Sequence, residues 1–424
     1  MPLIVQKFGG SSLADPDRIL SCAVRVAEAR QAGHDVLVVV SAMGDTTDEL
    51  ISMADAVNPA PSRRELDALL ASGEQISTAL MTMALHRSGV DAVSLTGGQL
   101  GISTDSSHSK ARIRRIDARR IRRELRAGRV VVGAGFQGVS EDGDITTLGR
   151  GGSDTTAVAL AAALKVGQKG GACEIYTDVD GVYTADPRVV SNARLLKEIS
   201  SEEMLELAAL GASVIHARAV LFGERFNVPI HVRHSAKPES GTMIMKDSSN
   251  IELNSVVGCA IKHDLGRVTL RRIPNIVGVQ STIFGLIAKR GILVDDIVQT
   301  EFSDMANISF TVDHSELQEA KIVASEVLEE LGSGEISIEV GLAKVSVIGA
   351  GMRSHSGVAS TMFQALAAAN IPIHNITTSE IRISCIVPKE SGKLALGCLH
   401  DAFKLSDGGS SMHVPSPASE DSIA

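Results

Sequence analysis

The sequence predicts an α/β protein in two parts: a three-layer αβα domain on a mostly parallel sheet, followed by two small βαββαβ units. Three observations support this fold class. Short apolar runs alternate with helical periodicity over residues 1–235, residues 236–254 are polar and carry Pro, Gly and Ser, and the pattern then changes to a weak internal repeat. We therefore expect a first domain at 1–235, a linker at 236–254, and repeat units at 255–341 and 342–405.

The first domain alternates strands with helices. The predicted strands are at residues 3–7, 36–40, 92–95, 130–133, 174–177 and 230–232. The predicted helices are at residues 19–30, 65–86, 113–126, 155–164 and 202–224. Because the strands are continuously apolar, they are typical of a parallel sheet that helices cover on both faces.

The second part repeats itself at a constant offset of 79 residues, so that Gly278 and Phe284 recur as Gly357 and Phe363. Each copy has the order strand, loop, helix, strand, strand, which suits a small βαββαβ unit. The stretch from Ser406 onward is rich in Ser, Gly and Pro, and we predict a disordered tail at residues 406–424.

The amino-acid composition disfavours some classes of binding partner. The formal net charge of −9 disfavours a nucleic-acid partner or an anionic membrane surface, and the chain has no Trp and only two Tyr for stacking on bases. No apolar run approaches the roughly 20 residues that span a bilayer. The chain starts directly in a strand pattern, without a signal peptide, and its five cysteines form neither a CxxC pair nor a metal-ligand spacing. We expect reduced thiols, no protein-only metal site and a cytoplasmic location.

Residues 110–129 hold ten basic residues, which raises nucleic-acid binding as an alternative function. Aromatic residues are absent from this stretch, the charges surround the predicted helix, and Asp117 and Glu124 interrupt the run. A solvated or subunit-contacting face is therefore favoured over a nucleic-acid site.

The first glycine-rich loop opens the chain. Lys7 ends a strand, Gly9, Gly10 and Ser11 follow, and Asp15 before a proline predicts the N-cap of a helix. Glycines between a strand and a helix let backbone N–H groups converge on an anion, and Lys7 would neutralise phosphate oxygens. The alternative is a tight turn with a solvated lysine.

A second glycine-rich segment, residues 149–155, precedes an Ala-rich helix. Two such helix entrances together suit a nucleoside triphosphate. Asp154 lies inside this loop, where it would organise Lys7 or bind Mg²⁺. The alternative for Asp154 is an ordinary residue of a helix start. Residues 133–138 match GxGxxG, but polar, turn-rich sequence follows them, so the context of a dinucleotide site is missing.

Three further segments offer groups for small ligands. Residues 41–47 follow the second strand at its carboxyl end, where α/β sheets bind their ligands. Residues 72–74 lie at a predicted break between two helical stretches. We assign Glu74 to a substrate ammonium and Thr47 to a carboxylate, with helix capping as the alternative for both. Residues 176–188 offer a flat ring, a cation and acceptors, which suit adenine, ribose and phosphates.

Together these segments resemble the aspartate kinases of the amino-acid kinase superfamily. The resemblance rests on residues 7–12, 41–44, 72–74, 135–156 and 177–188, which occur in the family's order and cover nearly the whole first domain. The later repeat resembles the paired ACT domains that regulate this family. The resemblance implies phosphoryl transfer from ATP, with Mg²⁺, to the side-chain carboxylate of L-aspartate, the first step toward lysine, threonine, methionine and isoleucine.

The resemblance also assigns residues. It makes Lys7 and Asp154 catalytic. It assigns aspartate binding to Ser41, Thr47, Glu74, Arg150, Gly151 and Ser153. It assigns ATP binding to Lys7, Gly9, Gly10, Ser11, Thr177, Asp178, Tyr183 and Arg188. It assigns effector binding to Asn275, Gly278, Gln280, Asp295, Gln299 and Glu380.

The regulatory half departs from the family pattern. Relatives carry Asp-x-Pro-Gly where this chain has Asn275-Ile-Val-Gly278, and Gln-Asn where it has Gln299-Thr300. His-Pro-Gly becomes His355-Ser-Gly357. Lysine or threonine are the expected effectors, and homo-oligomerisation through the ACT units is expected. The competing functions are another kinase of the superfamily, acting on glutamate, acetylglutamate, carbamate or uridylate, and a catalytically silent amino-acid sensor.

Overall fold

The structure, a computed structural model, describes residues 2–211, 214–237, 240–246 and 255–407. Contacts divide the chain into two compact units. Unit 1 is Met1–Tyr183 with Leu195–Ile251, and unit 2 is Thr184–Arg194 with Glu252–Ala424. Residues Thr184–Arg194 thus belong to unit 2, although they lie inside the range 1–235 that the sequence predicts as one domain.

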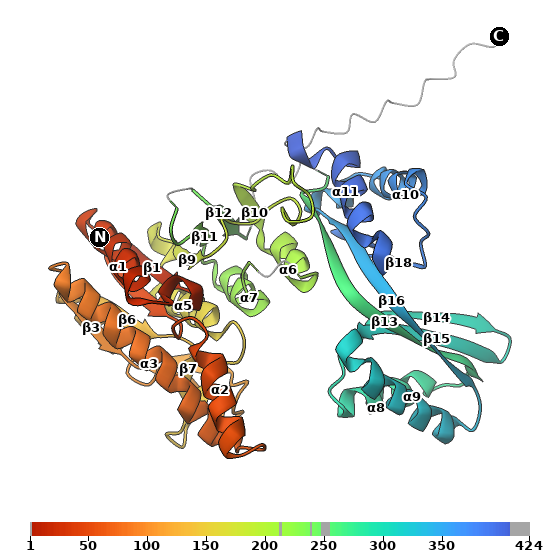
Figure 1. The fold of residues 1–424 in the computed structure, drawn as a ribbon, viewed down its shortest axis with the longest axis horizontal. Helices are drawn as coiled ribbons and strands as arrows, with labels where there is room; N and C mark the ends of the chain where they lie inside the picture. The colour runs from red at the N-terminus through yellow and green to blue at the C-terminus, as the bar shows by residue number, and fades with distance from the viewer. Residues whose placement is uncertain (1, 212–213, 238–239, 247–254, 408–424) are drawn as a thin grey trace, which may run out of the picture. The chain divides into compact units, whose positions relative to one another are not determined.

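Unit 1 contains an eight-stranded sheet of order β10-β12-β11-β9-β1-β2-β6-β3 (Figure 1). Only the β11–β12 pair is antiparallel in this sheet, so the predicted mostly parallel sheet is confirmed. Its strands are β1 (Leu3–Phe8), β2 (Asp35–Val40), β3 (Ala92–Leu95), β6 (Val130–Ala134), β9 (Cys173–Thr177), β10 (Glu198–Ser200), β11 (Ile230–His234) and β12 (Thr242–Met245).

A small four-stranded sheet of order β5-β4-β7-β8 lies beside it in unit 1. Its strands are β4 (Ile102–Thr104), β5 (Ile113–Ile116), β7 (Gln137–Val139) and β8 (Ile145–Thr147). β7 and β8 form a hairpin in the segment that the sequence predicts to be turn-rich and without a helix, so the GxGxxG match has no dinucleotide-binding context.

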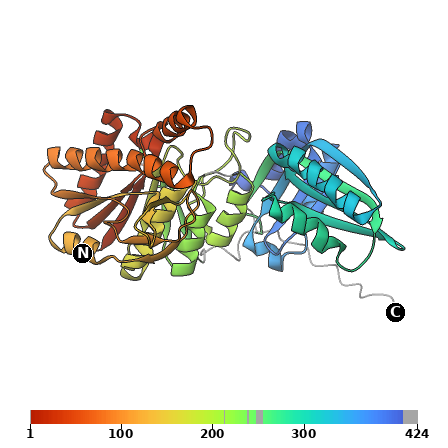
Figure 2. The ribbon, with the colours of Figure 1, turned by 90° about the horizontal axis from the view of Figure 1, so that it is seen from below.

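Seven α-helices are described in unit 1, with a second view in Figure 2: α1 (Pro16–Gln31), α2 (Thr46–Val57), α3 (Arg63–Arg87), α4 (Arg119–Arg126), α5 (Gly152–Leu164), α6 (Ser201–Ala209) and α7 (Ala217–Phe226). α1 and α3 bury Val26 and Met81 against alternate side chains of β2 and β6, such as Val38 and Val132. α5 packs against β1, β2 and β9. Asp15 caps α1 by accepting from the Arg18 N–H, as predicted.

Four predictions for unit 1 are wrong in detail. The helix expected at 113–126 begins with strand β5, because the two isoleucines of Ile-Arg-Arg-Ile at 113–116 have a helix-like spacing of three, although the segment pairs as the edge strand of the small sheet. The helix expected at 202–224 is two helices, α6 and α7. Residues 72–74 lie inside the continuous helix α3, and no break occurs there. The expected linker contains β12, which buries Thr242 and Ile244 in the large sheet.

Unit 2 contains a six-stranded sheet of order β14-β15-β13-β16-β18-β17. Its elements are β13 (Gly258–Pro274), α8 (Val279–Lys289), β14 (Asp295–Phe302), β15 (Met305–Asp313), α9 (Leu317–Leu331), β16 (Glu335–Ile348), α10 (Val358–Ala368), β17 (Asn375–Thr378), β18 (Arg382–Pro388) and α11 (Gly392–Ala402). The first repeat has the predicted order β13-α8-β14-β15-α9-β16.

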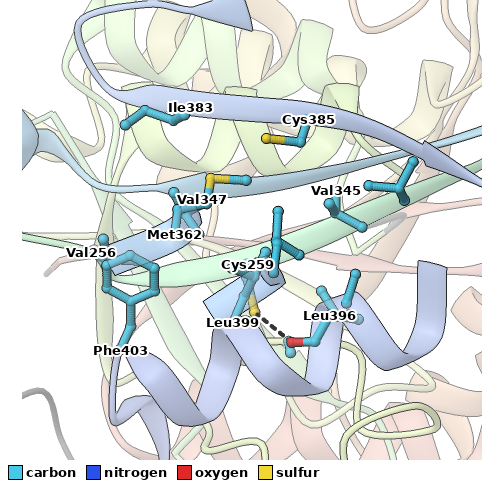
Figure 3. Close-up of a cluster of buried hydrophobic side chains, with 14 of the residues drawn as sticks. Val256, Cys259, Val345, Val347, Met362, Ile383, Cys385, Leu396, Leu399 and Phe403 are labelled. Atoms are coloured by element: carbon cyan, nitrogen blue, oxygen red, sulfur yellow. Dashed lines mark hydrogen bonds between the residues drawn. The ribbon is translucent and has the colours of Figure 1, made fainter. Parts of the chain in front are cut away.

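The second repeat is completed differently from the prediction. No strand follows α11 in the described residues up to 407, and the first residues of β13 take that place, pairing Gly258 with Ile348 and Lys262 with Lys344. β13 and β16 are therefore shared by both repeats, and the expected boundary at 341–342 falls inside β16. Figure 3 shows the core of the second repeat, where Val345, Met362 and Leu399 pack together. Ala185 and Val190 of Thr184–Arg194 belong to the same core.

Among the described residues, none of the helices combines the length and the apolar character needed to cross a membrane. All five cysteines are free thiols, and four of them are buried. The predicted tail lies outside the described residues from 408 onward, and so does the part of the expected linker at 247–254.

Candidate functional site

A cavity of about 930 Å³ opens in unit 1 at the carboxyl ends of β1, β2 and β9. Three helices begin at it: α2, α5 and α7. Ten of the predicted site residues line it: Lys7, Gly10, Ser41, Thr47, Glu74, Arg150, Gly151, Ser153, Asp154 and Thr177. These residues come from five segments far apart in the sequence, so the fold brings most of the predicted site together.

Lys7 and Asp154 form an ion pair in this cavity. The Lys7 Nζ lies 2.7 Å from the Asp154 Oδ1, and Lys7 is only 9% exposed. The other carboxyl oxygen of Asp154 accepts a 3.4 Å hydrogen bond from the His216 N–H. The pair joins the end of β1 to the first turn of α5, so Asp154 fixes the ammonium of Lys7 beside the N-terminus of a helix. The Lys7 ammonium and the N-terminus of α5 both carry positive charge, so they favour a polyanionic ligand beside them.

The first glycine-rich loop lies tightly against the loop after β2. The Gly44 N–H donates to the Gly10 carbonyl at 3.0 Å. A Cβ on Gly10 would lie 2.9 Å from the Ala42 carbonyl oxygen, so a larger residue would push the two loops apart. Gly10 is required there by this close approach of two backbones.

Glu74 is a buried carboxyl with an incomplete set of partners. It is 3% exposed, and its Oε1 accepts from the Ala42 N–H at 3.1 Å. Its Oε2 has no hydrogen-bond partner among the described residues, although it is buried. Burial raises the pKa of Glu74 to about 7, against a smaller lowering by the Ala42 N–H. A cationic ligand group in the cavity would satisfy the free oxygen and stabilise the ionised form.

The second glycine-rich segment forms a turn into α5. Gly149 and Gly151 have φ of 79° and 64°, and the Gly152 N–H closes the turn on the Gly149 carbonyl at 2.9 Å. A Cβ on Gly151 would lie 2.1 Å from the His216 ring, so only glycine fits. Arg150 at the tip of the turn is exposed and lines the cavity, where its planar guanidinium can bind a carboxylate with two hydrogen bonds.

The loop after β9 is less complete as a nucleotide site. Thr177 lines the cavity and donates to the Asp178 Oδ1 at 3.0 Å, whereas Asp178 does not line it. The Tyr183 hydroxyl donates to the Asp180 Oδ2 at 3.0 Å. Tyr176 is buried with its ring stacked on Phe8 at 4.9 Å, which excludes this ring as a platform for adenine.

Four more predicted residues lie outside the lining. Gly9 and Ser11 flank the lining residue Gly10, and a Cβ on Gly9 would lie 3.4 Å from the Lys7 Nζ. Tyr183 is the last residue of unit 1 before the segment Thr184–Arg194, and Arg188 belongs to that segment of unit 2, where it pairs with Asp186 at 2.8 Å.

Sequence reasoning missed His216. It lines the cavity, and its Nδ1 accepts from the Arg218 N–H as the N-cap of α7. The expectation of one long helix over 202–224 concealed this helix start. A histidine before a second helical period was the available signal.

The expected effector residues lie in unit 2. Gln280 donates to Gln299 at 2.9 Å, and Gly278 is the N-cap of α8 with φ of 99°. The Asp295 Oδ2 lies 2.5 Å from the Nζ of Lys344, which is fully buried. The Asn275 N–H donates to the Asp304 carbonyl at 2.8 Å.

Glu380 lies apart from these residues, at a second cavity of about 460 Å³ near the start of α10. It pairs there with Arg353 at 3.0 Å. Its carboxylate is thus already engaged by a cation in the described structure.

Two protein-family models match parts of this chain. An amino acid kinase family model matches residues 2–234, and an ACT domain model matches residues 345–403. The chain is 50% identical over 407 residues to an aspartate kinase of Pseudomonas putida and to aspartokinase 2 of Bacillus subtilis, covering 96% of this chain and 98% of each relative.

Among solved structures, E. coli aspartokinase III in complex with aspartate and ADP aligns with a TM-score of 0.77 at 27% identity. This alignment covers 95% of this chain and 100% of the other. The same enzyme in complex with lysine and aspartate aligns with a TM-score of 0.75 at 28% identity, covering 95% of this chain and 99% of the other.

Proposed function

This chain belongs to the amino acid kinase family and, within it, to the aspartate kinases, and we propose that it converts L-aspartate and ATP to 4-phospho-L-aspartate and ADP. The observation that carries the proposal is the Lys7–Asp154 ion pair at the entrance of α5, inside the large cavity. The complex of the E. coli neighbour with aspartate and ADP supports the choice of substrates.

The main barrier to this reaction is charge. A side-chain carboxylate with a pKa of about 3.9 is already ionised at neutral pH, so the nucleophile needs no strong base. The anion must approach a polyanion instead. Lys7 and the N-terminus of α5 offer positive charge where the transferring phosphoryl group would develop its negative charge.

Two ionic contacts would fix the orientation of the bound aspartate, one to its ammonium and one to a carboxylate. Glu74 would accept from the α-ammonium of aspartate through its unpartnered Oε2. Arg150 would bind a carboxylate of aspartate bidentately. Further contacts with aspartate are proposed for Ser41, Thr47, Gly151 and Ser153.

The nucleotide would lie on the side of Lys7 that faces away from the bound aspartate. Contacts with ATP are proposed for Gly9, Gly10, Ser11, Thr177, Asp178, Tyr183 and Arg188. Mg²⁺ is proposed as the cofactor, because this ion typically binds through one or two carboxylates together with substrate phosphates. The carboxyl of Asp154 in the cavity fits that donor set, and the ion would neutralise phosphate charge.

We further propose how the enzyme is regulated, where it acts and how it assembles. The ACT domain supports regulation by an amino acid, and lysine or threonine are the proposed effectors. We place the reaction in the cytoplasm at the start of the routes to lysine, threonine, methionine and isoleucine. We also propose a homo-oligomer assembled through the ACT units.

A coupled assay of ADP release with L-aspartate tests the proposal. Trapping with hydroxylamine then identifies the product, because an acyl phosphate gives an aspartyl hydroxamate and a phosphate ester does not. Glutamate, acetylglutamate, carbamate and uridylate serve as competing substrates. ADP release with one of these, and none with aspartate, would overturn the proposal. A silent amino-acid sensor would release no ADP with any of them.

A further inference from the structure

Asp67 is a fully buried carboxyl that the proposed reaction does not use. It lies in α3, is 0% exposed, and receives hydrogen bonds on both oxygens. The Ser109 N–H reaches both oxygens at 3.1 and 3.0 Å. Thr147 donates its N–H at 3.0 Å and its hydroxyl at 2.6 Å, and the His108 Nδ1 lies 2.9 Å away. A carboxyl with this many partners fixes the segments that supply them.

The segments held by Asp67 form one wall of the large cavity, because Ser109 and Thr147 both line it. Ser109 has φ of 70°, a left-handed conformation that a serine adopts only when its surroundings impose it. Its N–H is the group that Asp67 binds twice. Asp67 therefore holds strained backbone in place at the site.

The same contacts extend to the turn that carries Arg150. Thr147 is the last residue of β8, three positions before Arg150. A Cβ on Gly149 would lie 3.0 Å from the Ser109 carbonyl oxygen, so the two segments are in close contact beside the turn. Arg218 clamps the same two segments, donating to the carbonyls of Leu148 and Ala111 at 3.0 Å each.

We propose that Asp67 is a positioning residue for the aspartate subsite: it aligns Thr147 and Ser109, and through them the Gly149–Gly151 turn with Arg150. Asp67 acts on the substrate only through these segments, and it does not hold Lys7 or the glycine-rich loop after β1. Its loss therefore affects aspartate binding and leaves ATP binding unchanged. This inference rests on the proposed function for the identity of the substrate.

Two substitutions separate the hydrogen bonds of Asp67 from its charge. Asp67→Asn can direct its NH₂ to the Thr147 hydroxyl, which can accept, while its oxygen still receives the two backbone N–H groups. Asp67→Ala removes every one of these bonds. We expect Asp67→Ala to raise the KM for aspartate at least tenfold and the KM for ATP less than twofold, and we expect Asp67→Asn to restore the aspartate KM to within threefold of the wild type.

Glu124 provides a matched control. It is a carboxyl in the same unit that is 3% exposed and pairs with Arg123 at 2.9 Å, and it does not line the large cavity. Glu124→Ala should lower the thermal midpoint and leave both KM values unchanged. An equal rise of both KM values in Asp67→Ala, an unchanged aspartate KM, or the same KM effect in Glu124→Ala would overturn the proposal.

Calorimetric titration of aspartate with a non-hydrolysable ATP analogue measures the same subsite without turnover. Weaker aspartate binding to Asp67→Ala, with the analogue bound normally, is the expected result, and equal binding to variant and wild type would overturn the inference. A wild-type protein that turns over another substrate instead would overturn the proposed function, and binding of that substrate would then be compared between the variants.

Discussion

Lys7 reaches the cavity from the end of β1, and its largely buried ammonium is oriented by the ion pair with Asp154. At this scale the chemistry depends on one charge placed where a phosphoryl group would be transferred. A cation that is already oriented needs no reorganisation when the transition state forms, which is the source of its catalytic effect. The ion pair therefore stabilises an arrangement for a ligand more than it stabilises the fold.

Replacing Lys7 with Ala should lower kcat by about 10²–10³-fold, because a charge contact of the transition state is lost. Asp154→Asn should act in the same direction by releasing the lysine. Steady-state kinetics at saturating substrates measures both effects. Lys197→Ala, an exposed lysine of the same unit, is the control and should keep normal kcat. A near-normal kcat in Lys7→Ala would contradict the proposed position of the phosphates.

The protonation state of Glu74 should make aspartate binding depend on pH. Its raised pKa, about 7, means that it must lose a proton before it can pair with the substrate ammonium. The KM for aspartate should therefore fall as pH rises from 6 to 8, by up to about tenfold per unit on the acidic side. Glu74→Gln should raise this KM and abolish its pH dependence while leaving the KM for ATP unchanged. A parallel pH dependence in wild type and variant would show that another group titrates.

The same carboxyl affects stability. The unfolded chain releases this proton near pH 4.5 and the folded chain near pH 7, so the folded protein loses stability between these values. Glu74→Gln removes this loss and should stabilise the free protein at pH 8, by at most about 3 kcal/mol, with little effect at pH 4.5. Denaturant unfolding at the two pH values measures the difference. Equal stability of variant and wild type at pH 8 would mean that Glu74 ionises without cost.

At the scale of elements, the entrance of α5 depends on backbone geometry. Gly151 has a positive φ and no space for a Cβ beside His216, so this turn, the start of α7 and the cavity wall fix one another. The turn supplies Arg150, Gly151 and Asp154 together. A change of one residue in it therefore displaces several groups of the proposed site at once.

Gly151→Ala should reduce kcat/KM for aspartate by roughly 10²-fold, because the turn must move to relieve the contact with His216. Gly143→Ala is a matched control: Gly143 also has a positive φ, 85°, but a Cβ there meets nothing within 4 Å. Both variants should pay the cost of a positive φ at a non-glycine residue, and only Gly151→Ala, which also meets His216, should lose activity. Equal kinetics for the two variants would show that the turn tolerates displacement.

At the scale of the whole molecule, the departures in unit 2 predict weak feedback by lysine or threonine. Asn275 stands where the resemblance to the aspartate kinases implies an aspartate, so a negative charge for an effector ammonium is missing, and Glu380 is already paired with Arg353. Val277 in place of proline leaves the loop less restricted before binding. Initial rates with each amino acid alone and with both together measure this. Half-inhibition at low micromolar concentration of either one would refute the prediction.

The sequence by itself determined the order of most elements, the two glycine-rich helix entrances and ten of the residues that line the cavity. These features are encoded locally: hydrophobic period identifies strands and helices, and glycine identifies turns that no other residue can form. The expectation of two repeat units was also local, since each copy preserves its own pattern of glycine and apolar residues.

Only the tertiary structure decided which distant segments meet. The pairing of β13 with β16 in both repeats, the burial of Thr184–Arg194 in unit 2, and the contacts of Asp67 with Ser109 and Thr147 join residues that are 42 or more positions apart. No local period marks such partners, because their free energy comes from burial and hydrogen bonds that form only when the whole chain folds. For that reason Asp67 had no signal as a site residue in the sequence, and His216 had only the signal of a helix start, whereas Lys7 and Gly151 lie in glycine-rich motifs that the sequence shows directly.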